Sequence, residues 1–229
     1  MTVFLPDEAS EIDTWIFDLD NTLYPPETRL FDQISDRMAA YIVRTLGVGQ
    51  ETAHDLRARY WANHGTTLAG LMANHDIDPE HFLLDVHDID FSPLTPNAAL
   101  RDGIEALPGR KVIFTNGDTP YAARVLEGLG LSGSFDALYG IEHVNYVPKP
   151  AAVAFDTIIA HDGHNPARAA FFEDTVVNLE VPKARGMATI YVGPDTPEAS
   201  YVDYKTSDLT GFLSQITDAA LPPRARRIP

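Results

Sequence analysis

The sequence predicts an α/β protein in which helices cover both faces of a parallel sheet and an all-helical segment is inserted after the first strand. Two observations lead to this prediction. Short apolar strands alternate with helical segments over most of the chain, whereas residues 24–91 contain helical patterns and no convincing strand. Continuously apolar strands are typical of parallel sheets that helices cover on both sides.

Five segments have the apolar and aromatic composition of buried strands. The first begins at Thr14 and ends in a carboxylate, Asp18. The predicted strands are residues 14–18, 111–115, 135–139, 169–172 and 188–192.

Three helices are predicted between these strands, at residues 97–107, 121–129 and 151–160. The first two follow Thr95-Pro96 and Thr119-Pro120, in which a capping residue precedes a proline at the first helical position. Gly130 is placed to end the second helix, because glycine readily adopts the left-handed conformation found just beyond a helix.

The inserted stretch has apolar residues at helical spacing, and Asp78-Pro79 begins a further helix that runs to Val86. An insertion after the first strand lies over the carboxyl ends of the strands, where open α/β sheets bind ligands, so we expect a lid. The predicted domains are an α/β core (1–23 and 92–221), a helical cap (24–91) and a flexible basic tail (222–229). The residues predicted on the apolar faces of the cap helices are Leu30, Phe31, Ile34, Met38, Tyr41, Ile42, Ala53, Leu56, Tyr60 and Trp61.

The chain is strongly acidic, with 17 Lys+Arg against 33 Asp+Glu among 229 residues and a formal net charge of −16. Such a surface repels polyanions, so we expect neither nucleic acid nor an anionic membrane as a partner, and a solvated tail is favoured over a tail that binds nucleic acid. The absence of cysteine excludes disulfides and thiolate ligands. No apolar run of about 18 residues and no signal-peptide pattern occur, so we expect a cytoplasmic location.

Asp18 and Asp20 follow the first strand, and alternation along an extended chain places both on the same side. Two carboxylates this close repel each other unless a cation or a proton intervenes, and Mg²⁺ is the plain candidate for oxygen ligands. A surface turn or a calcium loop has the same Asp-x-Asp pattern. The apolar residues on either side favour a functional site.

Polar residues also end or follow the later strands. Thr115 and Asn116 offer a hydroxyl and an amide suited to anionic oxygens, although Asn-Gly is also a common turn pair. Lys149 lies between two prolines, which stiffen the loop that carries it. Glu173 and Asp174 follow the fourth strand, and we expect both in a loop, because Pro182 argues against an early start of the next helix.

Because the carboxyl ends of parallel strands share one edge of the sheet, these groups are expected to converge. Carboxylates, a hydroxyl, an amide and one ammonium suit phosphoryl transfer through an aspartyl-phosphate, assisted by Mg²⁺. The expected substrate is a small phosphate ester.

The ordered set Asp18-x-Asp20-x-Thr22, Thr115-Asn116, Lys149 and Glu173-Asp174 resembles the four motifs of the haloacid dehalogenase superfamily of phosphohydrolases. The resemblance covers about residues 14–192 and implies a Rossmann-like core with a helical cap. It implies that Asp18 is the nucleophile and Asp20 the general acid and base, which also binds Mg²⁺ through its backbone carbonyl.

The same resemblance implies roles for the remaining motif residues. Thr115 and Asn116 hold the phosphoryl group, and Lys149 neutralises it and orients the nucleophile. Asp174 binds Mg²⁺, and Glu173 does so directly or through water. Thr22 steadies the loop of the first motif.

Three alternatives stay open. The name-giving dehalogenases need no metal and lack the second acid of the first motif, so Asp20 and Glu173-Asp174 favour a phosphatase. A response-regulator receiver also uses Asp, Thr, Lys and Mg²⁺, but it is about half this length and has no cap. A non-catalytic binding module is the third.

Three stretches resemble the pyrimidine 5′-nucleotidase branch: residues 17–24, residues 60–71 and the segment from Glu173 to Met187. That resemblance implies hydrolysis of UMP- or CMP-like monophosphates. Residues 64–71 are the segment we assign to the leaving group, with a helix N-terminus packed on the core as the equal alternative. Phosphoglycolate and sugar phosphates are the alternative substrates.

Overall fold

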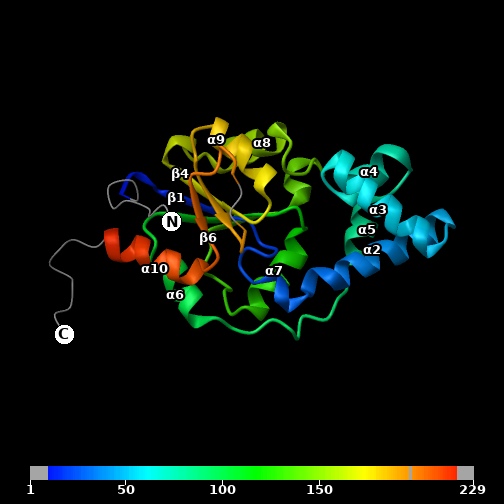
Figure 1. The fold of residues 1–229 in the computed structure, drawn as a ribbon, viewed down its shortest axis with the longest axis horizontal. Helices are drawn as coiled ribbons and strands as arrows, with labels where there is room; N and C mark the ends of the chain where they lie inside the picture. The colour runs from blue at the N-terminus through cyan, green and yellow to red at the C-terminus, as the bar shows by residue number, and fades with distance from the viewer. Residues whose placement is uncertain (1–9, 196–197, 221–229) are drawn as a thin grey trace.

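The computed structural model describes residues 10–195 and 198–220. Six parallel strands form one sheet in the order β3-β2-β1-β4-β5-β6 (Figure 1). The central position of β1, between β2 and β4, makes it the point at which the strand order reverses, which is where open α/β sheets bind ligands. The strands are β1 (Thr14–Phe17), β2 (Arg110–Phe114), β3 (Ala137–Tyr139), β4 (Ala169–Glu173), β5 (Ala188–Val192) and β6 (Tyr204–Thr206).

All five predicted strands are present, and the parallel α/β fold is confirmed. The sixth strand, β6, was not predicted, because three residues that include Lys205 give no apolar run. The prediction that Glu173 lies in a loop is wrong. Its backbone pairs with Tyr191 of β5, so it is the last residue of β4, and only Asp174 lies beyond the strand.

Helices cover both faces of the sheet, with α8 and α9 on one side and α6 and α10 on the other (Figure 1). The core helices are α6 (Ala98–Ala106), α7 (Thr119–Gly128), α8 (Ala152–Asp162), α9 (Glu180–Ala184) and α10 (Leu209–Ala220). Short 3-10 turns lie at η1 (Pro26–Thr28), η2 (Ile141–Val144), η3 (Pro166–Arg168) and η4 (Val176–Leu179).

The predicted helix caps differ from those in the structure. Asn97, not Thr95, caps α6, because its side-chain oxygen accepts a hydrogen bond from the amide of Leu100 at 3.0 Å. Asp118, not Thr119, caps α7 by accepting from the amide of Tyr121 at 3.0 Å. Asn and Asp side chains are strong helix caps, so each helix begins at the residue that follows one.

Four helices form a separate group at one end of the molecule, which we call the helical lobe (Figure 1). They are α2 (Leu30–Leu46), α3 (Gln50–His64), α4 (Thr67–Asn74) and α5 (Pro79–Val86). The all-helical character of this stretch is as predicted. Its boundaries as a cap domain stay a prediction, and the basic tail lies outside the described residues.

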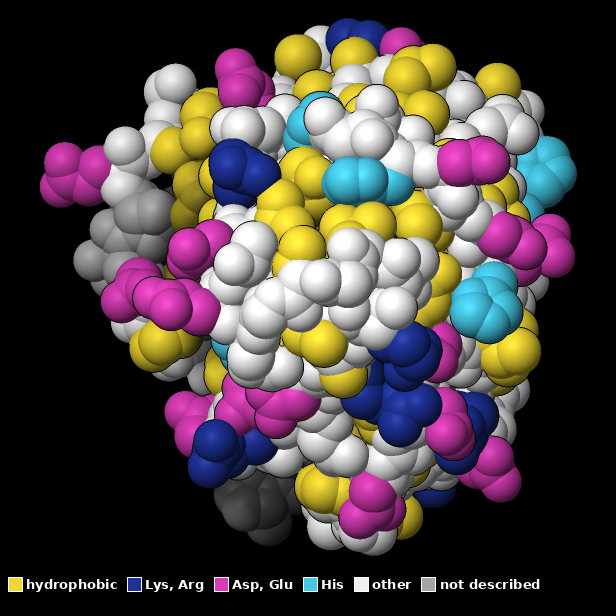
Figure 2. Space-filling model, turned by 90° about the vertical axis from the view of Figure 1, so that its right-hand side faces the viewer, with side chains coloured by type: hydrophobic (Ala, Val, Ile, Leu, Met, Phe, Trp, Pro, Cys, Tyr) yellow, Lys and Arg dark blue, Asp and Glu magenta, His cyan; other side chains and the backbone are white. Residues whose placement is uncertain are grey.

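Most of the apolar residues predicted for the lobe are buried, but Met38 is only partly buried and two others are exposed. Trp61 is 61% exposed and Phe31 is 38% exposed. Figure 2, which looks at the lobe end of the molecule, shows apolar side chains at the surface among charged ones. None of the helices in the described part of the chain has the length and apolar character needed to cross a bilayer, and the cytoplasmic location stays a prediction.

The core between β1 and β4 is built on stacked aromatic rings. The rings of Phe17 and Phe172 stack with centroids 4.5 Å apart, and both side chains are fully buried. We expect Phe172→Ala to lower the free energy of unfolding by about 3–5 kcal/mol, because it leaves a cavity beneath the site. Urea unfolding measures this, with Leu84→Ala at an exposed position as the control. Equal effects of the two substitutions would contradict the packing.

Candidate active site

The predicted site residues converge at the carboxyl edge of the sheet. Asp18 continues β1, and its amide donates to the carbonyl oxygen of Phe172 at 2.9 Å. Thr115 continues β2 in the same way, donating to the carbonyl oxygen of Tyr139 at 3.0 Å. The ladder hydrogen bonds thus extend one residue beyond the strands and fix the backbone of both residues.

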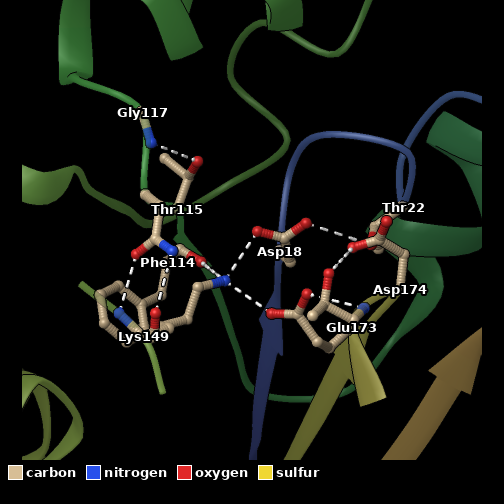
Figure 3. Close-up of polar contacts among 10 residues, drawn as sticks. Asp18, Thr22, Phe114, Thr115, Gly117, Lys149, Glu173 and Asp174 are labelled. Atoms are coloured by element: carbon tan, nitrogen blue, oxygen red, sulfur yellow. Dashed lines mark hydrogen bonds and ion pairs between the residues drawn. The ribbon is translucent and has the colours of Figure 1, made fainter. Parts of the chain in front are cut away.

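Lys149 is the centre of the site (Figure 3). Its ammonium donates to Asp18 Oδ1 at 2.7 Å, to Glu173 Oε2 at 2.7 Å and to the carbonyl oxygen of Phe114 at 3.0 Å. The side chain is 1% exposed, so all three ammonium protons have partners away from water. Burial by itself lowers the pKa of Lys149, but the two carboxylates outweigh it and hold the pKa above its usual value. Lys149 is therefore a permanent cation.

Asn116 fixes the loop that carries this lysine. Its side-chain oxygen accepts from the Lys149 amide at 2.9 Å, and its side-chain nitrogen donates to the Lys149 carbonyl at 3.3 Å. Both polar atoms of Asn116 therefore bind the backbone of Lys149. A phosphoryl-binding role for Asn116 stays a prediction.

Two threonines complete the immediate surroundings. Thr22 donates to Asp18 Oδ2 at 3.2 Å, so both oxygens of this carboxylate have partners. The hydroxyl of Thr115 accepts from the Gly117 amide at 2.9 Å, which leaves its proton available to a ligand (Figure 3).

Three carboxyl groups lie close enough to share one cation. One oxygen from each of Asp18, Glu173 and Asp174 lies within 4.8 Å of the other two. Burial, which disfavours the charged form, is the main cause that raises the pKa of Asp18 to about 7, of Glu173 to about 7 and of Asp174 to about 6. Oxygen ligands that repel one another in this way fit a hard divalent cation such as Mg²⁺.

The three carboxyl groups are not equally available to a cation. Glu173 already accepts from Lys149 through one oxygen and from the Thr175 amide, at 3.1 Å, through the other. Asp174 accepts from the Thr175 hydroxyl through Oδ1 at 3.2 Å. Both oxygens of Glu173 are thus engaged, and metal binding by Glu173 and Asp174 stays a prediction.

Asp20 has a different environment from Asp18. Its Oδ1 accepts short hydrogen bonds from the hydroxyls of Tyr24 and Tyr121. Burial raises the pKa of Asp20 above its usual value, while the two hydroxyls act in the opposite direction. Neither tyrosine was predicted as a site residue. Tyr24 was detectable, since it follows Asp20 by four residues, but Tyr121 is 101 residues away.

The lobe contacts the residues around Asp20 through His87, which lies at the end of α5. The imidazole stacks on the ring of Tyr121 with centroids 4.2 Å apart, and its Nδ1 lies 2.9 Å from Asp118 Oδ1. Asp118 also caps α7, so one carboxylate connects the lobe to the helix that carries Tyr121. The lobe therefore helps to position the ring that binds Asp20.

A cavity of about 330 Å³ lies between the sheet edge and the lobe. Every predicted site residue except Thr22 lines it, together with side chains from α2, α3, α4 and α5. Its volume is at the low end of the range typical of small-ligand sites. The lobe comes close to the core beside Lys149, because a Cβ at Gly65 would lie 3.2 Å from the Lys149 carbonyl oxygen.

Residues 64–71, predicted as either a substrate segment or a packed helix N-terminus, have both features. Thr66, Thr67 and Leu68 line the cavity. Thr66 also caps α4 by accepting from the Ala69 amide at 3.1 Å, and Leu68 is buried. The leaving-group role of this segment stays a prediction.

The fold and the site define a class: α/β proteins with an aspartate and a buried lysine at the carboxyl edge of a parallel sheet. Residues 12–186 match the family described as haloacid dehalogenase-like hydrolase, and the chain belongs to that family. Phosphate metabolism protein 8 of Saccharomyces cerevisiae is 26% identical over 206 residues, 81% of this chain. The match spans 63% of the length of that relative.

Solved structures share the fold. CbbY from Rhodobacter sphaeroides, in complex with phosphate, aligns with a TM-score of 0.63 at 16% identity, over 90% of this chain and 99% of that one. The L-2-haloacid dehalogenase from Xanthobacter autotrophicus aligns with a TM-score of 0.58 at 16% identity, over 90% and 98%. Because proteins of different chemistry share this fold, the reaction must be argued from the site.

Proposed function

We propose that this chain is a Mg²⁺-dependent phosphomonoesterase that acts through an aspartyl-phosphate on Asp18. The observation that supports this most strongly is the setting of the Asp18 carboxylate. Lys149 and Thr22 hold its two oxygens, and Asp174 lies within the distance at which both could bind one cation. A carboxylate fixed in this way at a cavity floor suits attack on an electrophile.

The residues present fit the cation that this chemistry uses. Asp18 and Asp174 would hold Mg²⁺, with Glu173 contributing directly or through water and Asp20 through its backbone carbonyl. When bound, the ion supplies positive charge that offsets the negative charge of the phosphoryl oxygens. Lys149 supplies a second, permanent positive charge beside Asp18, and the Thr115 hydroxyl offers a donor to a phosphoryl oxygen.

The proposed reaction has two displacements at phosphorus. In the first, an Asp18 oxygen attacks, the bond from phosphorus to the ester oxygen breaks, and Asp20 donates a proton to the departing alcohol. In the second, Asp20 takes a proton from the attacking water, the bond to Asp18 breaks and inorganic phosphate leaves. The raised pKa of Asp20 suits this alternation between acid and base.

The dehalogenase alternative shares Asp18 and Lys149 but has no use for a proton donor at Asp20 or a cation site at Asp174. Two tyrosines hold Asp20 at the cavity, and Asp174 has an oxygen near Asp18. Both features favour the phosphatase.

We expect Asp20→Asn to lower kcat/KM for UMP by about 10²- to 10⁴-fold and kcat/KM for p-nitrophenyl phosphate much less, because kcat/KM reports the steps up to departure of the leaving group and not the later hydrolysis of the aspartyl-phosphate. An alkoxide needs a proton in order to leave, whereas p-nitrophenolate does not. Steady-state kinetics on both substrates measure the difference. Equal losses would contradict the role of Asp20 as a general acid.

For the substrate we propose pyrimidine nucleoside 5′-monophosphates. Support comes from the three stretches that resemble that branch and from a cavity whose lobe side is lined by Phe31, Trp61 and Leu68. Phosphate release from UMP, CMP, AMP, phosphoglycolate and a sugar phosphate tests this proposal. The highest kcat/KM is expected for UMP or CMP. A higher value for phosphoglycolate or the sugar phosphate would overturn the substrate class but not the reaction.

A further inference from the structure

Arg57 and Trp61 lie four residues apart on α3, so both project from the same side of that helix. Both line the cavity above Asp18 (helix α3 in Figure 1). Trp61 was predicted to pack in the lobe, but the structure leaves its indole 61% exposed. Neither residue has a role in the proposed reaction.

Arg57 has a buried donor without a partner. Its Nε has no hydrogen bond in the described part of the chain, and its Nη1 donates to Ser35 Oγ at 3.4 Å. No carboxylate forms an ion pair with Arg57 within residues 10–195 and 198–220. Because Arg57 lines the cavity and no carboxylate of the described residues neutralises it, its guanidinium is suited to donate to an acceptor on a ligand there.

The phosphoryl group is not that acceptor. It must contact Asp18 at the sheet edge, where Lys149 is the cation, whereas Arg57 lies on the lobe. The part of the substrate that extends toward the lobe is the leaving group. A guanidinium there suits an oxygen acceptor, and an exposed indole suits a flat ring that stacks on it.

Trp61 also lines the open groove next to the cavity, beside Tyr146 and Pro148. It therefore stands where the cavity meets the surface. An aromatic ring at that place can cover a base while one edge remains in water.

We propose that Arg57 and Trp61 form a leaving-group subsite that recognises a planar ring carrying a carbonyl oxygen. The Arg57 guanidinium donates to the oxygen, and the indole stacks on the ring. Uracil and cytosine both have this chemistry. The inference rests on the proposed function, in which the leaving group is a pyrimidine nucleoside.

Ribose 5-phosphate separates the subsite from the rest of the site, because it is UMP without its base. We expect Arg57→Met to lower kcat/KM for UMP by about 10- to 100-fold, the loss typical of one charge-assisted hydrogen bond, and to leave kcat/KM for ribose 5-phosphate within about twofold. Trp61→Ala should have the same selectivity. Arg59→Met, at an exposed arginine two residues along α3, should change neither value.

Equal losses on UMP and ribose 5-phosphate would overturn the subsite and make Arg57 structural. Unchanged UMP kinetics would overturn it as well. Arg57→Lys keeps the charge and most of the packing, so it replaces methionine if Arg57→Met does not fold, with the same selective loss expected.

Fluorescence tests the subsite without turnover. Trp15 is fully buried and Trp61 is exposed, so a ring stacked on Trp61 should quench emission. In Asp18→Asn, UMP should quench saturably and ribose 5-phosphate should not, and Arg57→Met should weaken the UMP response. Saturable quenching of Asp18→Asn by UMP, combined with no hydrolysis of UMP by the unsubstituted protein, would overturn the proposed substrate and keep the subsite. Hydrolysis of UMP by the unsubstituted protein, without quenching of Asp18→Asn by UMP, would overturn the subsite and keep the proposed substrate.

Discussion

Asp18→Asn lowers kcat for UMP and for p-nitrophenyl phosphate by more than about 10³-fold, because the amide cannot form the acyl phosphate. The fold is expected to persist, since the remaining side-chain oxygen can still accept from Lys149 and the change in volume is small. Phosphate release measures the first expectation, and a thermal melt measures the second.

Asp13→Asn is the matched control for this substitution. Asp13 precedes the same strand and pairs with Arg168 at 2.6 Å on the surface, far from the cavity lining. It should retain nearly full activity. Residual activity of Asp18→Asn above about one percent would remove Asp18 as the nucleophile.

Removal of divalent cations is the second large effect. EDTA should lower kcat by more than about 10²-fold, and added Mg²⁺ should restore it, because the cluster of Asp18, Glu173 and Asp174 needs positive charge to bind a phosphate dianion. Activity that survives chelation would favour the dehalogenase chemistry.

The concentration of Mg²⁺ that the enzyme requires should increase as the pH falls. The pKa of Asp18 is raised to about 7 and that of Asp174 to about 6, so both bind protons increasingly as the pH falls. Protons and Mg²⁺ compete for the same oxygens, so the Mg²⁺ concentration for half-maximal activity should rise as the pH falls from about 8 to about 6. A requirement that weakens toward low pH would contradict these ligands.

Much of this site could be predicted because strand ends are visible in the sequence. Asp18, Thr115 and Glu173 each close an apolar run, and parallel strands bring such ends to one edge. Lys149 was detectable from the prolines beside it. Its complete burial was not, because that depends on Asn116 binding the loop backbone from 33 residues away.

Other contacts depend on packing that no local pattern reports. Tyr121 meets Asp20 only because α7 follows the strand next to β1. Trp61 fits the helical periodicity of the lobe, yet it lies beside Tyr60, which is buried, and adjacent helical residues point in different directions. A period of 3.6 residues identifies a helix but does not say which flank of its apolar face lines a cavity.

The direct test of the central claim is to find the phosphoryl group on Asp18. Enzyme quenched during turnover of UMP is treated with borohydride, which reduces an acyl phosphate to the alcohol, and the peptides are analysed by mass spectrometry. We expect homoserine at position 18, and no reduced residue when substrate or Mg²⁺ is left out. Homoserine at another acidic position, or an unmodified Asp18 in enzyme trapped during rapid turnover, would contradict the account.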